Sequence, residues 1–189
     1  MIKKNFQRSH LRSPMKSRVV FSLGNKVGMS HTINISRGGL LVNEIEGAKV
    51  GDKVWTFIEL VILPTFSEQS EESILSIDER EFEKEILSIK FEIVRIFDGP
   101  TQTSDKKVSQ MGTRFDNIDT ETQKTIDSYV ETFKKNVVYL LTLIERLGRS
   151  SGPPGVFKKV ANLLGYNPEE KIALLRQKVL HDYQSLEGP

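Results

Sequence analysis

The sequence predicts a mainly β protein: a six-stranded antiparallel β-barrel, a long C-terminal helix and a small α-helical extension. Six short segments rich in β-branched and aromatic residues precede residue 118, and no helical period separates them. After that residue the apolar positions recur at helical spacing. A chain of 189 residues, 38% of them hydrophobic, suffices for one domain with a modest appendage. We expect three parts: an N-terminal arm over 1–17, the barrel over 18–119, and helices over 120–189.

Each expected strand ends at turn residues or at a change of pattern. The pair Gly24-Asn25 follows the first segment, and Arg37-Gly38-Gly39 separates the second from the third. Trp55 falls in the long apolar run VWTFIELVIL, so we expect it in the core. The expected strands are residues 18–23, 27–35, 40–45, 54–63, 86–97 and 107–115.

An acidic insert interrupts the strand pattern at residues 64–85. It carries eight acidic residues against Arg80 and Lys84. We expect an excursion between two strands, partly disordered or a short helix, and we favour the simpler interpretation of a solvated loop.

Three helices are expected after the last strand. Thr120-Glu121-Thr122-Gln123 fits a capping box at the start of a helix that extends to Gly148. Further helices are expected over 156–164 and over 168–183, the latter starting at Asn167-Pro168. Five large apolar side chains between residues 140 and 147 need burial. Either the two later helices fold back over them, which we favour, or a second copy of the chain pairs with them as a homo-oligomer.

The charge of the chain is unevenly distributed. Residues 1–43 contain eight basic residues and no acidic one, although the net charge of the whole chain is only +2. This stretch is a candidate anion-binding surface, and a basic tail without a ligand is the alternative. The small net charge excludes a uniformly basic coat for nucleic acid.

Composition and motifs argue against several function classes. Cysteine is absent and the three histidines are scattered, so we expect no metal site. No nucleotide-binding loop, nucleophile elbow or zinc-protease motif is present, so we expect neither an enzyme nor catalytic residues. No run approaches a membrane span, and the basic start lacks the apolar segment of a signal peptide. We therefore expect a cytoplasmic protein.

Two weak motifs fall inside the acid-free stretch. The first is a pair of arginines four residues apart, Arg8 and Arg12, with His10 between them. The second is Asn34-Ile35-Ser36-Arg37-Gly38-Gly39, at the end of an expected strand. In this order, ahead of a six-strand pattern, the sequence resembles the PilZ domain family of bacterial cyclic di-GMP receptors, with the signature R-x-x-x-R followed by [D/N]-x-S-x-x-G. The similarity covers roughly residues 6–135 and includes Gly112-Thr113-Arg114-Phe115-Asp116.

The resemblance implies a cyclic di-GMP site formed by the residues that match the signature: Arg8, Arg12, Asn34, Ser36 and Gly39. Arg37 and His10 are additional candidates. It also implies a receptor in second messenger signalling, of the kind that controls motility and biofilm formation. The ligand would order the arm onto the barrel and relay the signal to a downstream protein partner.

Physical chemistry agrees with this assignment. A guanidinium holds a phosphate with two parallel bonds or pairs with guanine O6 and N7. Asn34 and Ser36 offer an amide and a hydroxyl to a guanine edge, and Gly39 either takes a backbone geometry closed to other residues or lets the ligand approach closely.

Two alternatives stay open from the sequence. The first is a PilZ-like interaction module in motility or envelope assembly that does not bind nucleotide. The second is a single-stranded nucleic-acid binder, which the scarcity of aromatic residues among the basic ones disfavours.

Overall fold

The computed structural model describes the backbone of residues 12–100, 107–148 and 154–186, and the side chains of 12–97, 109–148 and 154–184. The described residues form two compact units. One consists of Pro14–Val61 and Lys84–Asp127 and contains the barrel. The other contains Ile62–Glu83, the described chain from Ser128 onward, and the arm residues Arg12 and Ser13.

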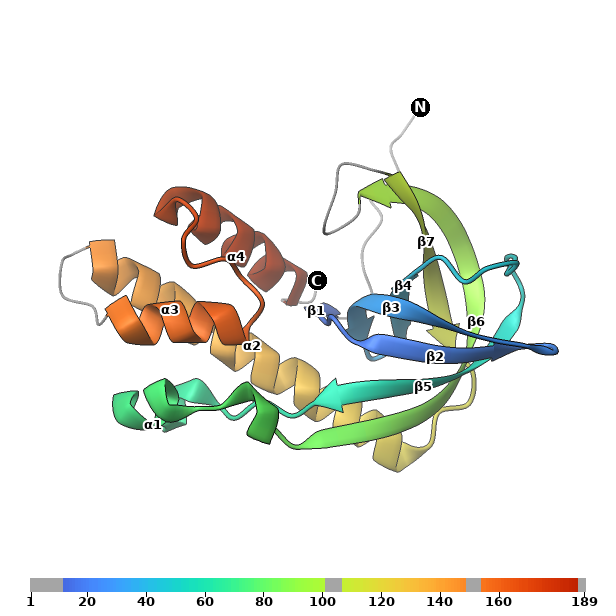
Figure 1. The fold of residues 1–189 in the computed structure, drawn as a ribbon, viewed down its shortest axis with the longest axis horizontal. Helices are drawn as coiled ribbons and strands as arrows, with labels where there is room; N and C mark the ends of the chain where they lie inside the picture. Colours follow the sequence, from blue (N-terminus) through green and yellow to red (C-terminus); the bar gives the residue numbers. More distant parts are fainter. Residues whose placement is uncertain (1–11, 101–106, 149–153, 187–189) are drawn as a thin grey trace. The chain divides into compact units, whose positions relative to one another are not determined.

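The first unit is a closed antiparallel barrel (Figure 1). Its six strands follow the order β3-β2-β5-β6-β7-β4, and pairing of β3 with β4 closes it. All six expected strands are confirmed. Their bounds are β2 (Arg18–Leu23), β3 (Lys26–Ser36), β4 (Gly39–Asn43), β5 (Lys53–Val61), β6 (Lys84–Pro100) and β7 (Lys107–Phe115). A short extra strand, β1 (Arg12–Pro14), lies beside β3.

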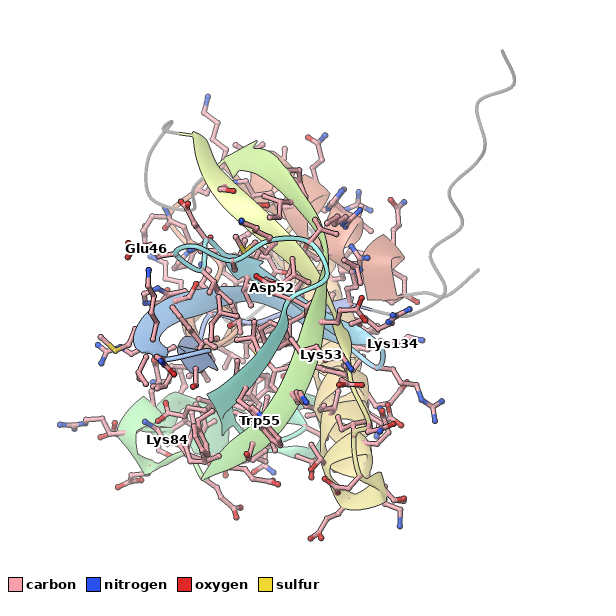
Figure 2. All side chains as sticks on the ribbon, turned by 90° about the vertical axis from the view of Figure 1, so that its right-hand side faces the viewer. Glu46, Asp52, Lys53, Trp55, Lys84 and Lys134 are labelled. Carbon is pink, nitrogen blue, oxygen red and sulfur yellow. The ribbon has the colours of Figure 1, made fainter. Side chains whose placement is uncertain are left out.

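The barrel core is built by strict alternation along β5. Val54, Ile58 and Leu60 are fully buried, whereas Trp55 and Phe57 are 54% and 55% exposed. The expectation of a core Trp55 is therefore wrong. Lys53 and Trp55, labelled in Figure 2, follow one another on the same side of the strand, and the Lys90 ammonium lies 5.6 Å from the Trp55 ring. The apolar run of β5 thus has one face in the core and one outside it.

Helix α2 (Thr120–Gly148) begins one residue after its cap. Asp119, not Thr120, caps the helix: its carboxylate accepts bonds from the Thr122 amide at 2.8 Å and the Thr122 hydroxyl at 2.6 Å. These bonds lower the pKa of the Asp119 carboxyl. The expected capping box is wrong in this detail, since the Gln123 side chain points along the helix and donates to Asp127 at 3.0 Å.

The acidic insert is folded rather than a solvated loop. It contains the helix α1 (Glu71–Ser76) between two short 3-10 turns, η1 (Phe66–Glu68) and η2 (Glu79–Glu81). Phe66 and Ile74 are fully buried. Asn136 of α2, itself fully buried, accepts a bond from the Phe66 amide at 2.8 Å and donates to the Pro64 carbonyl at 2.9 Å. The favoured interpretation of a solvated loop is therefore wrong, and the alternative of a short helix is confirmed.

Two further helices complete the second unit: α3 (Pro154–Leu163) and α4 (Ile172–Leu186) (Figure 1). Leu140, Leu143 and Ile144 of α2 are buried in the unit that also contains α3 and α4, so the apolar segment is covered within the chain. The start expected for α4 is wrong by several residues, because Asn167 forms a turn that accepts from the Glu169 and Glu170 amides. Among the described helices, none is long and apolar enough to cross a membrane.

Candidate ligand-binding site

The second sequence motif forms the hairpin that joins β3 to β4. Ser36 pairs with Gly39 across a two-residue turn made of Arg37 and Gly38. The Ser36 side chain is buried, and its hydroxyl donates to the Gly39 carbonyl at 3.0 Å. The Gly38 carbonyl accepts from the Phe115 amide of β7 at 3.0 Å. Both strands and β7 therefore fix the hairpin without any ligand.

The strand register places the motif side chains on the side of the sheet away from the core. Ile35 and Leu40, which pair with one another, are buried in the barrel. Asn34 and Ser36 flank Ile35 and so project from the opposite side. A bulge between Thr32 and Asn34 keeps this alternation in phase with β4. The structure thus brings Asn34 and Ser36 to one face, as their spacing predicts.

Gly39 is required by a close approach between strands. A Cβ at this position would lie 2.0 Å from the Thr113 carbonyl oxygen of β7. Gly39 is not among the described glycines with positive φ, so the unusual backbone geometry offered as one alternative is wrong. The adjoining Leu40 amide donates to the Thr113 hydroxyl at 3.0 Å, and that hydroxyl donates back to the Leu40 carbonyl at 3.1 Å.

Arg37, an additional candidate, lies at the tip of the hairpin. Its Nε is 3.7 Å from a carboxylate oxygen of Asp127 in the first part of α2. Both side chains are substantially exposed, so this ion pair is screened by solvent and contributes little to stability. Arg37 can therefore exchange this partner for a ligand at low cost.

The arginine arm is described only at its end. Arg8 and His10 lie outside the described residues. Arg12 begins β1 and is half-buried, and the next residue, Ser13, is fully buried. Burial raises the pKa of the Tyr129 hydroxyl on α2 to about 12, and a side-chain hydrogen bond with Ser13 opposes that shift. The end of the arm is therefore attached to α2.

Charged residues on and next to the last strands of the barrel pair with one another. Arg114 of β7 donates to Glu92 of β6 at 2.7 Å. Asp116 binds the Lys53 ammonium at 2.9 Å, and this contact lowers the pKa of its carboxyl. Within the described chain there is no cluster of three side chains that could hold a metal ion.

Sequence reasoning did not single out Arg95, which lies beside this site. A bulge in β6 between Ile93 and Arg95 brings Arg95 opposite Gly112 on the face away from the core. Alternation along β6 predicts which residues next to Ile93 face outward, but it does not predict the bulge. The sequence therefore does not indicate that Arg95 lies opposite Gly112.

A six-stranded barrel with a polar hairpin on its outer side and arginines around it defines the class of protein. The chain belongs to the PilZ domain family, whose model matches residues 6–132. No curated protein matches the chain.

Several solved structures are similar to it. The inhibitor of motility MotI/DgrA from Bacillus subtilis is 18% identical with a TM-score of 0.47, covering 65% of this chain and 49% of that one. The PilZ domain of YcgR from Escherichia coli, solved with c-di-GMP, is 10% identical with a TM-score of 0.48, covering 76% and 97%. A complex of MrkH from K. pneumonia with c-di-GMP is 11% identical with a TM-score of 0.43, covering 76% and 55%. The match thus spans about half the length of MotI/DgrA and of MrkH.

Proposed function

We propose that this protein is a cytoplasmic receptor for cyclic di-GMP and not an enzyme. The observation that carries the proposal is the motif hairpin, which holds Asn34, Ser36 and Gly39 together on the outer side of a PilZ barrel. The proposed site residues are Arg8, Arg12, Asn34, Ser36 and Gly39, with Arg37 and His10 as additional candidates.

The chemistry of the ligand fits these side chains. Asn34 presents an amide that both donates and accepts, as a guanine edge requires. Ser36 uses its hydrogen on the Gly39 carbonyl, and its oxygen keeps lone pairs that can accept from the guanine amine. The arm arginines supply charge for phosphate and a planar face for stacking on guanine.

The receptor would act through its arm. Ligand contacts at Arg8 and Arg12 would hold the arm on the barrel. Because Ser13 at the end of the arm is buried and bonded to Tyr129 of α2, ordering of the arm would reach that helix directly. The output would pass from α2 to a downstream protein partner.

Calorimetric titration with cyclic di-GMP tests the proposal, with GTP and cyclic AMP as controls. Arg8→Ala and Arg12→Ala should each weaken binding by about 2 kcal/mol, roughly 30-fold, the loss expected for a charge-assisted contact. Arg18→Ala, which removes an exposed arginine of β2, is the matched control and should bind like the wild type. Wild-type protein that releases no heat with cyclic di-GMP would refute the proposal and favour a nucleotide-independent interaction module.

The division of roles between the arm and the hairpin has its own test. Asn34→Ala should lower affinity without changing its dependence on salt, because Asn34 is neutral. Arg12→Ala should reduce that dependence, because a phosphate contact is lost. An identical salt response in both variants would contradict this division.

A further inference from the structure

A row of residues crosses four strands of the barrel on the side away from the core. Asn34 of β3 lies opposite Leu41 of β4, Leu41 opposite Gly112 of β7, and Gly112 opposite Arg95 of β6. Neighbouring strands lie about 4.8 Å apart. The row therefore extends about 14 Å from the motif asparagine to the backbone of Arg95.

Two glycines leave the middle of this face without side chains. Gly39 pairs with Ser36 in the adjacent row. A Cβ built on Gly39 would lie 3.1 Å from the Arg114 Cα on β7. Gly39 and Gly112 thus stand on neighbouring strands, two residues apart along the sheet. A planar ligand can approach the backbone closely at such a surface.

Arg95 lies flat across one of these glycines. A Cβ on Gly112 would meet Nε of Arg95 at 2.7 Å and its Cγ at 2.8 Å. The guanidinium carbon of Arg95 lies 4.9 Å from the centre of the Phe97 ring, two residues further along β6. The absence of a side chain at Gly112 and the support of Phe97 together let the exposed Arg95 side chain extend along the sheet over β7.

Arg95 differs from Arg37 and Arg114, each of which has an acidic partner. Arg114 is paired with Glu92 at 2.7 Å, and Arg37 faces Asp127. Among the described residues, Arg95 has no acidic partner within ion-pair distance. A guanidinium that is held in place but not neutralised is suited to an anionic ligand.

We propose that Arg95 binds one phosphate of the cyclic dinucleotide, on the glycine surface opposite Asn34. This inference rests on the proposed function, since it names a further residue of the same site. The ligand carries two phosphates, so the arm arginines of the proposed function and Arg95 can hold one each. The guanidinium fork donates two parallel bonds to the phosphate oxygens.

Titration of Arg95→Ala with cyclic di-GMP tests the inference, alongside wild type and the Arg18→Ala control. We expect affinity to fall between tenfold and a hundredfold and its salt dependence to decrease, as for loss of a phosphate contact. Arg95→Lys should recover part of the affinity, because a point charge replaces the fork. Unchanged affinity in Arg95→Ala, or a loss of affinity with unchanged salt dependence, would overturn the phosphate contact. Wild-type protein that does not bind would instead overturn the proposed function itself.

A double-mutant cycle with Gly112→Ala tests the role of the glycine. The added methyl group displaces Arg95, so Gly112→Ala should weaken binding in the wild-type background. In the Arg95→Ala background the same change should have little further effect. Equal losses in both backgrounds would contradict the link between Gly112 and Arg95, because the methyl group would then act on the ligand directly.

Discussion

Replacement of Gly39 by alanine should destabilise the barrel whether or not a ligand is present. The new Cβ would lie 2.0 Å from the Thr113 carbonyl oxygen, a backbone atom that cannot rotate away. Reaching an ordinary contact of 3.4 Å requires β4 and β7 to separate locally by about 1.4 Å. That movement breaks the two bonds between Leu40 and the Thr113 hydroxyl, which are now 3.0 and 3.1 Å long. The lost bonds and the strain together predict a decrease of about 2–4 kcal/mol in the free energy of unfolding.

Urea denaturation of the ligand-free protein measures this effect, with Gly148→Ala as the matched control. Nothing lies within 4 Å of a Cβ built on Gly148, so that variant should unfold like the wild type within about 0.5 kcal/mol. A Gly39→Ala protein with wild-type stability would refute the steric reasoning. If such a protein had also lost cyclic di-GMP binding, the glycine would be needed for the ligand and not for the sheet.

Other variants test the second unit, the end of the arm and the hairpin. Asn136→Ala leaves the buried Phe66 amide without its partner and should lower the free energy of unfolding by about 2–4 kcal/mol in urea denaturation. Tyr129 ionises at pH 10 in the unfolded chain and at about pH 12 in the folded protein, so its contribution to stability declines as pH rises from 10 to 12. Tyr129→Phe should therefore show a shallower loss of stability in alkaline titration followed by circular dichroism. Arg37→Ala breaks an exposed pair and should leave thermal unfolding unchanged within about 0.5 kcal/mol, so that any change in its affinity measured by calorimetry reports a ligand contact.

The strands could be predicted because alternation and turn residues are local signals. Every expected strand appears within a few residues of its expected bounds. The face that each residue occupies was harder to predict along β5. Lys53 and Glu59 alternate in phase with Trp55 and indicate an exposed side, but the large apolar side chain of Trp55 favoured the core. The structure places Trp55 outside the core.

Features that depend on distant residues were not predictable. The need for Gly39 arises from Thr113, which lies far along the chain. The acidic insert is ordered by burial of Phe66 and Ile74, two apolar residues among many charged ones. It is also held by the hydrogen bond from the Phe66 amide to Asn136, which no local sequence pattern predicts. The same holds for Arg95, whose position depends on a bulge in β6 and on a glycine in β7.

The polar groups in and around the motif hairpin differ in whether they already have a hydrogen-bonding or acidic partner within the protein. Ser36 donates to the Gly39 carbonyl, and Thr113 exchanges bonds with Leu40, so the hairpin keeps its geometry without a ligand. Arg95, by contrast, is supported by Phe97 but has no acidic partner among the described residues. Binding would then cost little reorganisation at the hairpin, and the conformational cost would fall on the arm. Changes at Ser36 or Gly39 should consequently affect stability and affinity together, whereas changes at Arg95 should affect affinity alone.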